Sequence, residues 1–164
     1  MATQGFVNRA GVSGLVVALL GFGALTFPAA LSARPAKLPT CTALRAVITP
    51  VIKRTLPITG DVIGGGDLGQ SVTCNYGSTL SVEIQPTVGA GVFDSDQAGT
   101  AKAKKVTGLG KKAFSALLSI SNGKRKTSYY ELEVLQGTAV LKVISTEFAL
   151  TTDETLATKL LPDL

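Results

Sequence analysis

The chain has 164 residues, of which 45% are hydrophobic and 16% are charged, and its formal net charge is +5. It contains no histidine and no tryptophan, and it has only two cysteines. This composition removes the commonest general base and metal ligand, and it excludes a zinc site built from several cysteines. The modest positive charge comes without a nucleic-acid-binding motif, so no nucleic-acid partner is predicted.

Residues 1–32 are predicted to be a signal peptide. Arg9 is the only charged residue before a long apolar run that ends near Pro28. The small-x-small pattern that precedes a cleavage site is met by Ala30-Leu31-Ser32. About twenty apolar residues can also span a bilayer, so an uncleaved signal anchor is the open alternative, with membrane contact only through residues 1–33.

The two cysteines, Cys41 and Cys74, are predicted to form a disulfide. Residues 33–40 are a short proline-containing linker, and residues 41–164 are predicted to be a single extracytoplasmic domain. An exported chain meets oxidising conditions, in which a lone pair of cysteines bonds. The alternative, a reactive thiol, needs a neighbouring base, and the chain has no histidine to provide one.

The first predicted element of this domain is a helix over residues 41–55. Its apolar residues recur at helical spacing: Leu44, Val47, Ile48, Val51 and Ile52. Thr40 or Thr42 can cap its start, and Pro50 predicts a kink or a break.

A hairpin and a second helix are predicted next. The hairpin strands alternate apolar and polar residues, with Val72, Cys74 and Tyr76 in the first and Leu80, Val82 and Ile84 in the second. A polar helix is predicted over residues 94–106, capped by Asp94 or Ser95 and ended by Gly108.

Three strands are predicted over residues 114–120, 129–135 and 139–146, with an Asn122-Gly123 turn between the first two. A last helix opens with a capping box from Thr151 to Glu154. This order of elements predicts an α+β fold, an antiparallel sheet of about five strands with helices packed against it.

Two literal motif matches lack the structural context that their chemistry needs. Residues 64–69 match the G-x-G-x-x-G dinucleotide pattern, but they lead into a predicted strand and not into a helix. We interpret them as a flexible connection. Residues 121–124 match the S-x-x-K nucleophile motif, which must begin a helix, whereas here it lies at a predicted hairpin tip. No catalytic residue, cofactor or metal is therefore predicted.

Acidic pairs occur at Asp94/Asp96, Asp153/Glu154 and Glu131/Glu133. The first two lie at predicted helix starts, where the helix dipole favours carboxylates. The third pair alternates with apolar residues and is predicted on the outer face of the sheet. General acid–base catalysis would need one of these groups to be buried, so an enzyme is not the favoured interpretation.

Lysines form the remaining candidate site. Lys104, Lys105, Lys111 and Lys112 lie close together in sequence and could bind an anionic polymer, although exposed turns ordinarily carry lysine. A second cationic group, residues 124–126, follows the far end of the strand that Lys112 precedes. Two separate basic patches are therefore expected.

The order of elements from Cys41 to Leu161 resembles the small exported cysteine-pair domains of actinobacteria. The resemblance rests on "CNY" at residues 74–76, "GLGKKAF" at 108–114 and "YELEVLQGTAVLKVIS" at 130–145. Lys111 stands where family members often carry an acidic residue, and no lipobox precedes the first cysteine. The resemblance implies an extracytoplasmic domain without assigned catalytic residues.

These patterns together favour a non-enzymatic binding or accessory domain of the cell envelope, secreted or tethered to the membrane. Its partner would be an envelope component or a protein. The alternative is a hydrolase that acts on an envelope component.

Overall fold

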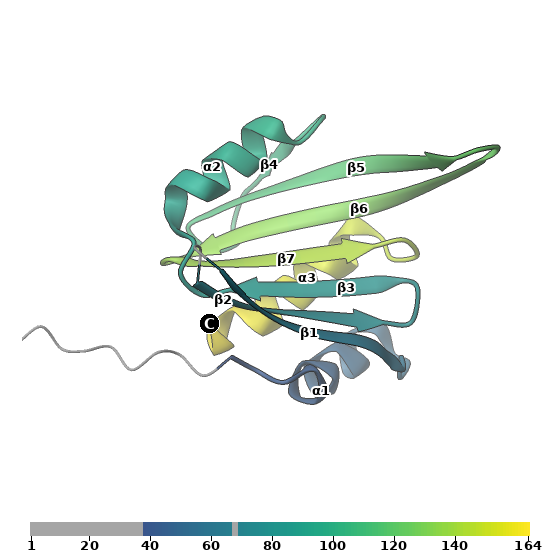
Figure 1. Cartoon of the computed structure of the whole chain (residues 1–164), viewed down its shortest axis with the longest axis horizontal. Coiled ribbons are helices and arrows are strands. Elements are labelled where there is room, and N and C mark those ends of the chain that lie inside the picture. Colours follow the sequence, from purple (N-terminus) through teal and green to yellow (C-terminus); the bar gives the residue numbers. More distant parts are fainter. Residues whose placement is uncertain (1–37, 67–68) are drawn as a thin grey trace, which may run out of the picture. The chain divides into compact units, whose positions relative to one another are not determined.

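The protein is described here from a computed structural model that covers residues 38–66 and 69–164. The predicted signal segment, and the predicted linker as far as residue 37, lie outside the described residues. The described residues form an α+β fold, an antiparallel sheet with three helices packed against it, as the sequence predicts (Figure 1).

The sheet has seven strands in the described residues, two more than the sequence analysis expects. They are β1 (Ile58–Gly66), β2 (Gly69–Tyr76), β3 (Leu80–Gln85), β4 (Lys104–Val106), β5 (Lys112–Asn122), β6 (Arg125–Gln136) and β7 (Ala139–Ser145). Their spatial order is β1-β2-β3-β7-β6-β5-β4. The chain therefore builds one meander, crosses the sheet to the far edge, and returns through a second meander that ends beside β3.

Helix α1 (Cys41–Ile52) begins where the sequence predicts and remains one helix. The Thr40 side chain accepts a hydrogen bond from the Ala43 amide at 3.2 Å, which satisfies one of the free amides of the first turn. Pro50 lies in the last turn, and Lys53 then takes a left-handed conformation with φ of 55°. The helix therefore ends soon after its proline, and it does not break into two.

The main core lies between one face of the sheet and two helices, α1 and α3 (Leu150–Leu160). The predicted alternation in β2 and β3 is confirmed, because Val72, Cys74, Tyr76, Leu80, Val82 and Ile84 all belong to this core. Helix α2 (Gly89–Gly99) packs on the other face, against Phe114, Leu135 and Val140. Figure 1 shows α3 behind the strands, α1 below β1, and α2 at the upper left beside β4 and β5.

The predicted helix over residues 94–106 was wrong at both ends. Helix α2 begins at Gly89, five residues before the predicted cap, and ends at Gly99. Its sheet-facing residue is Phe93, whose ring meets Phe114 edge-on at 5.4 Å. Lys102, with φ of 61°, then turns the chain, and residues 104–106 become strand β4 because β5 offers them backbone partners.

The glycine-rich segment is a strand, and the interpretation as a flexible connection was wrong. Residues 64–66 of β1 pair with residues 69–71 of β2 in an antiparallel hairpin. The segment leads into β2 and not into the N-terminus of a helix, so its backbone lacks the arrangement that cradles a pyrophosphate.

Candidate functional site

The disulfide between Cys41 and Cys74 is present and joins the start of α1 to the second half of β2. The two Cα atoms are 5.4 Å apart, and both residues are buried in the main core. Tyr76 supports the same junction, because its hydroxyl donates to the carbonyl oxygen of Cys41 at 2.9 Å. Burial raises the pKa of Tyr76 to about 12, so this donor stays protonated across the physiological range. A disulfide of this kind is typical of proteins that fold in an oxidising compartment.

The four candidate anion-binding lysines lie around one end of the sheet but do not converge. Lys104 and Lys105 are consecutive residues of β4, so their side chains point to opposite faces. The ammonium of Lys112 contacts both carboxylate oxygens of Asp94 at 2.7 and 2.8 Å, and thereby joins α2 to β5. Lys111 lies in the preceding turn, where its amide donates to the carbonyl of Leu135 at 2.8 Å.

That turn depends on Gly110, the last glycine of the Gly-Leu-Gly motif. Gly110 has φ of 52°, and a Cβ at this position would lie 2.6 Å from the carbonyl oxygen of Leu135. Only glycine allows this approach, so the motif has a structural role here, in placing the start of β5 beside β6.

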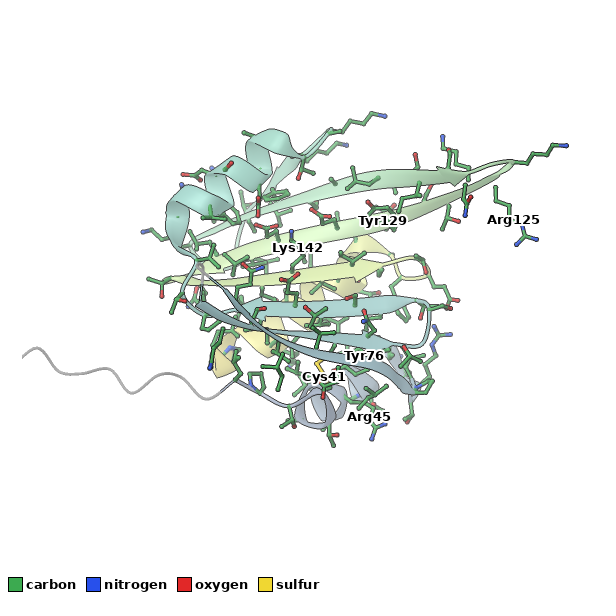
Figure 2. All side chains as sticks on the ribbon, viewed as in Figure 1. Cys41, Arg45, Tyr76, Arg125, Tyr129 and Lys142 are labelled. Carbon is green, nitrogen blue, oxygen red and sulfur yellow. A yellow bond between two sulfur atoms is a disulfide. The ribbon has the colours of Figure 1, made fainter. Side chains whose placement is uncertain are left out.

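The second cationic group lies at the far end of the same strand. Asn122 pairs with Arg125, and residues 123–124 form the turn between β5 and β6. The eleven residues of β5 separate Lys112 from this turn by roughly 33 Å. Figure 2 shows Arg125 at the tip of the long β5–β6 hairpin, far from Lys142 in the middle of the sheet. These two candidate groups of basic residues therefore lie at opposite ends of β5.

The more informative surface is the open face, which we define as the sheet face opposite α1 and α3, outside the area covered by α2. The side chains that β2, β3, β6 and β7 direct toward this side of the sheet include Thr73, Asn75, Ser81, Glu83, Glu131, Lys142 and Ile144, with Glu133 at the border of the area that α2 covers. Most of them are half-buried. No helix of the described residues packs over the β2–β3 turn end of this face, and a hollow lies there.

A row of charges crosses the open face beside α2. Lys142 on β7 lies directly opposite Glu83 on β3 and Glu133 on β6. The ammonium of Lys142 is 3.0 Å from Oε2 of Glu133, and the Glu133 side chain has no exposed surface. The sequence analysis placed Glu133 on the outer face. It is on the face away from the main core, but α2 and Phe114 help to bury it.

Burial raises the pKa of Glu133, and the neighbouring Lys142 opposes that rise. Burial alone would lower the pKa of Lys142, but Glu133, Glu131 and Asp96 raise it above its usual value. Oε1 of Glu133 has no hydrogen-bond partner among the described residues. The pair is therefore a structural ion pair with one unsatisfied oxygen and little access from solvent.

The hollow beside this row has a volume of about 340 Å³ and is lined by Thr59, Asn75, Gly77, Ser78, Thr79, Leu80, Ser81, Ile144 and Thr146. None of these lining residues is charged. Its frame is held by the backbone, since Gly77 donates to Pro57 at 2.8 Å and Thr146 donates to Thr79 at 3.0 Å. A small, fixed depression of uncharged hydrogen-bonding groups results.

Several of these groups have no partner within the described part of the chain. The Thr79 hydroxyl is buried without a hydrogen bond. The Asn75 amide lies over Gly60, where a Cβ would be only 2.8 Å from its Nδ2. Thr59 is the exception, because its hydroxyl donates to the Gly77 carbonyl at 2.8 Å. The sequence analysis missed this hollow, because its residues come from β1, the β2–β3 hairpin and β7.

A second hollow, of about 460 Å³, lies between α3 and the loop before β5. Its lining includes Thr107, Thr155 and Thr158. The hydroxyls of Thr155 and Thr158 donate to carbonyls one turn earlier in α3, each at 2.8 Å. The lining also includes Glu154 and Lys159, so this hollow, unlike the one on the open face, carries charged side chains.

The main core contains a buried acid that the sequence analysis assigned differently. The predicted capping box from Thr151 to Glu154 was wrong, because α3 begins at Leu150 without a side-chain cap. Asp153 instead turns inward and accepts a hydrogen bond from the Ser145 hydroxyl at 2.6 Å. Neither side chain is exposed, so a substrate has no access to this pair.

In the described ranges, no three side chains among histidine, cysteine, aspartate and glutamate are grouped so that they could hold a metal ion. Nor does any helix of residues 38–66 and 69–164 have the length and hydropathy required to cross a membrane.

Comparison with protein-family models, curated proteins and solved structures finds no match for this chain.

Proposed function

We propose that this protein is a non-enzymatic binding domain of the cell envelope, secreted or membrane-tethered, and that it binds its ligand on the open face. The observation that carries the proposal is the hollow beside the β2–β3 turn. It combines a fixed backbone frame with hydroxyl and amide groups that have no partner within the described residues. Its volume lies within the range of small-molecule sites, although its lining is more polar than is usual for them.

The lining suggests the ligand's chemistry. With no charged side chain in the hollow, a ligand group that carries hydroxyls or amides fits better than a phosphate or a carboxylate. Ile144 adds apolar surface. The lining has no aromatic ring, so we expect weak affinity for a single ligand unit.

Extracytoplasmic location is supported by the disulfide and by the resemblance to exported cysteine-pair domains. A disulfide that joins α1 to the sheet adds roughly 3–4 kcal/mol in the chain-entropy model, which is useful to a small domain in an oxidising medium.

The alternative is a hydrolase that acts on an envelope component, and the Glu133–Lys142 pair is the observation that favours it. A buried acid with a raised pKa is a common form of general acid. The complete burial of Glu133 argues against this, because a catalytic acid must reach its substrate.

The test is co-sedimentation of the oxidised, exported protein with insoluble cell-envelope material. Asn75→Ala combined with Ser81→Val removes hydrogen-bonding groups of the hollow, and we expect the bound fraction to fall at least several-fold. Thr155→Ala with Thr158→Ala, in the second hollow, is the matched control and should bind like the unmodified protein. Equal binding by both variants would contradict the proposal.

The same incubation distinguishes the binding domain from the alternative, a hydrolase. Release of soluble envelope fragments with time, abolished by Glu133→Gln, would establish a hydrolase.

A further inference from the structure

The sheet has two edge strands of very different character (Figure 1). At one edge, β4 has only three residues, two of which are Lys104 and Lys105. Short, lysine-bearing edge strands resist pairing with another chain. At the other edge, β1 has nine residues, without lysine or proline.

Strand β1 also exposes large apolar side chains. Val62 is 57% exposed and Ile63 is 73% exposed, although they are neighbours whose side chains point to opposite faces. Asp61 is the only charged residue of the strand. No strand of the described residues pairs with the outer backbone of β1. A long, nearly uncharged edge with exposed apolar groups on both faces is the kind of edge that pairs with another strand.

We propose that β1 pairs antiparallel with β1 of a second copy, so that the two seven-stranded sheets continue into one across a symmetric dimer. Side-by-side antiparallel pairing of identical strands requires a two-fold axis perpendicular to the sheet. In an antiparallel pair, directly opposite side chains point to the same face of the sheet. The axis must therefore pass between one residue and the same residue of the partner, and that residue faces its own counterpart.

The side chains of β1 select the position of this axis. An axis through Asp61 would place two carboxylates directly opposite each other, which is unfavourable. An axis through Ile63 places the two isoleucines together and pairs Val62 with Gly64 of the partner subunit. It also places Asp61 opposite a glycine, residue 65 of the other copy. This register brings the two copies of Ile63 into contact, and Ile63 is the most exposed large apolar residue of β1. It also keeps the two Asp61 carboxylates apart.

The pairing leaves the hollow of the open face unchanged. It uses residues 60–66, whereas the only β1 residue in the hollow's lining is Thr59. The inference is therefore independent of the proposed function. One strand pair buries little surface, so the dimer is weak and forms in the micromolar to millimolar range.

The test is sedimentation equilibrium of the disulfide-bonded protein, as exported by its expression host, over a wide concentration range. The average mass of the unmodified protein should rise from monomer toward dimer, whereas Ile63→Lys should remain monomeric because two ammonium groups would meet at the axis. Leu117→Lys changes a residue that is 52% exposed on β5, away from this edge, and is the matched control. Its mass should follow that of the unmodified protein.

Cross-linking tests the register and does not depend on the lysine variant folding. In the proposed dimer the Cα atoms of Ile63 and its counterpart lie about 5 Å apart, within disulfide range, whereas those of Val62 lie about 8 Å apart. Ile63→Cys should therefore form a covalent dimer under mild oxidation much faster than Val62→Cys. The native cysteines are buried and should not exchange.

A monomeric mass at all concentrations, or equal cross-linking at both positions, would overturn the proposal. Hydrogen exchange of the β1 amides gives a further test. Protection of these amides that depends on added envelope extract, and not on protein concentration, would also overturn the proposal, because a strand of a different protein would then be paired with β1.

Discussion

Ser145 on β7 donates a hydrogen bond to Asp153 on α3 at 2.6 Å, at a position where neither side chain has exposed surface. Burial raises the pKa of Asp153 to about 7, although the bond from Ser145 lowers it, and the other carboxylate oxygen has no partner among the described residues. We therefore expect the contact between α3 and the sheet to depend on pH.

The folding stability of the protein should fall as the pH rises from about 4 to about 7. In this range the unfolded chain has already lost the Asp153 proton, while the folded chain still holds it, so each step upward in pH favours unfolding. From the shift of Asp153 to about 7, the loss is at most about 4 kcal/mol. Urea denaturation at several pH values measures it.

Asp153→Asn is the control for this prediction, because an amide fills the same space and does not titrate. Its free energy of unfolding should change much less between pH 5 and pH 8. If the unmodified protein and the variant show the same pH dependence, Asp153 is ionised normally in the fold.

The Glu133–Lys142 pair should be strongly coupled. Lys142→Met leaves a buried carboxylate without its counter-charge, and we expect a loss of about 3 kcal/mol or more at neutral pH. Adding Glu133→Gln should restore much of that loss, since the buried charge is gone. A double-mutant cycle by urea denaturation gives the coupling.

Lys105→Met, on the short edge strand β4, is the control, because it makes the same change as Lys142→Met at an exposed lysine. It should change the free energy of unfolding by less than about 0.5 kcal/mol. Additive effects of the two substitutions at Glu133 and Lys142 would show that the pair contributes nothing as a pair.

Weak binding to a polyanion should depend more on the hairpin tip, residues 124–126, than on the other basic patch. Residues 124–126 bring three exposed cations to the end of the β5–β6 hairpin, no acidic residue occurs from 112 to 130, and none of the three cations has an ion-pair partner among the described residues. Changing all three to glutamine should lower the salt concentration that elutes the protein from a polyphosphate matrix.

The matched variant changes Lys104, Lys105 and Lys111 to glutamine, which removes the same charge from the other patch. Because Asp94 lies beside that patch, in contact with Lys112, its carboxylate offsets part of the positive charge there, and the variant should have the smaller effect. Equal shifts for the two triple variants would indicate that only net charge matters.

Local patterns in the sequence determined much of this fold. The alternation in residues 72–84 requires one face of a hairpin to be buried, and the helical spacing from Leu44 onward requires one face of a helix to be buried. Both are short-range properties, and the structure has both. The disulfide was also predictable, because only one pairing of cysteines exists in the chain.

The tertiary structure alone decided the two edge strands. Strand β1 is rich in glycine and β4 is mostly lysine, so neither carries an apolar pattern that predicts a strand. Each forms because a neighbouring strand presents unpaired amides and carbonyls beside it, and those neighbours are placed by contacts distant in sequence.

The same reason applies to the groups that bear on function. The alternation of residues in β6 predicts Glu133 on the surface. It is buried because α2, about forty residues earlier in the chain, packs over that part of the sheet. The sequence predicts Asp153 as an exposed carboxylate at a helix start. It turns inward because β7 places Ser145 opposite it. The hollow combines β1, the β2–β3 hairpin and β7. Burial and proximity of this kind arise only when separate segments pack, so no local pattern in the sequence records them.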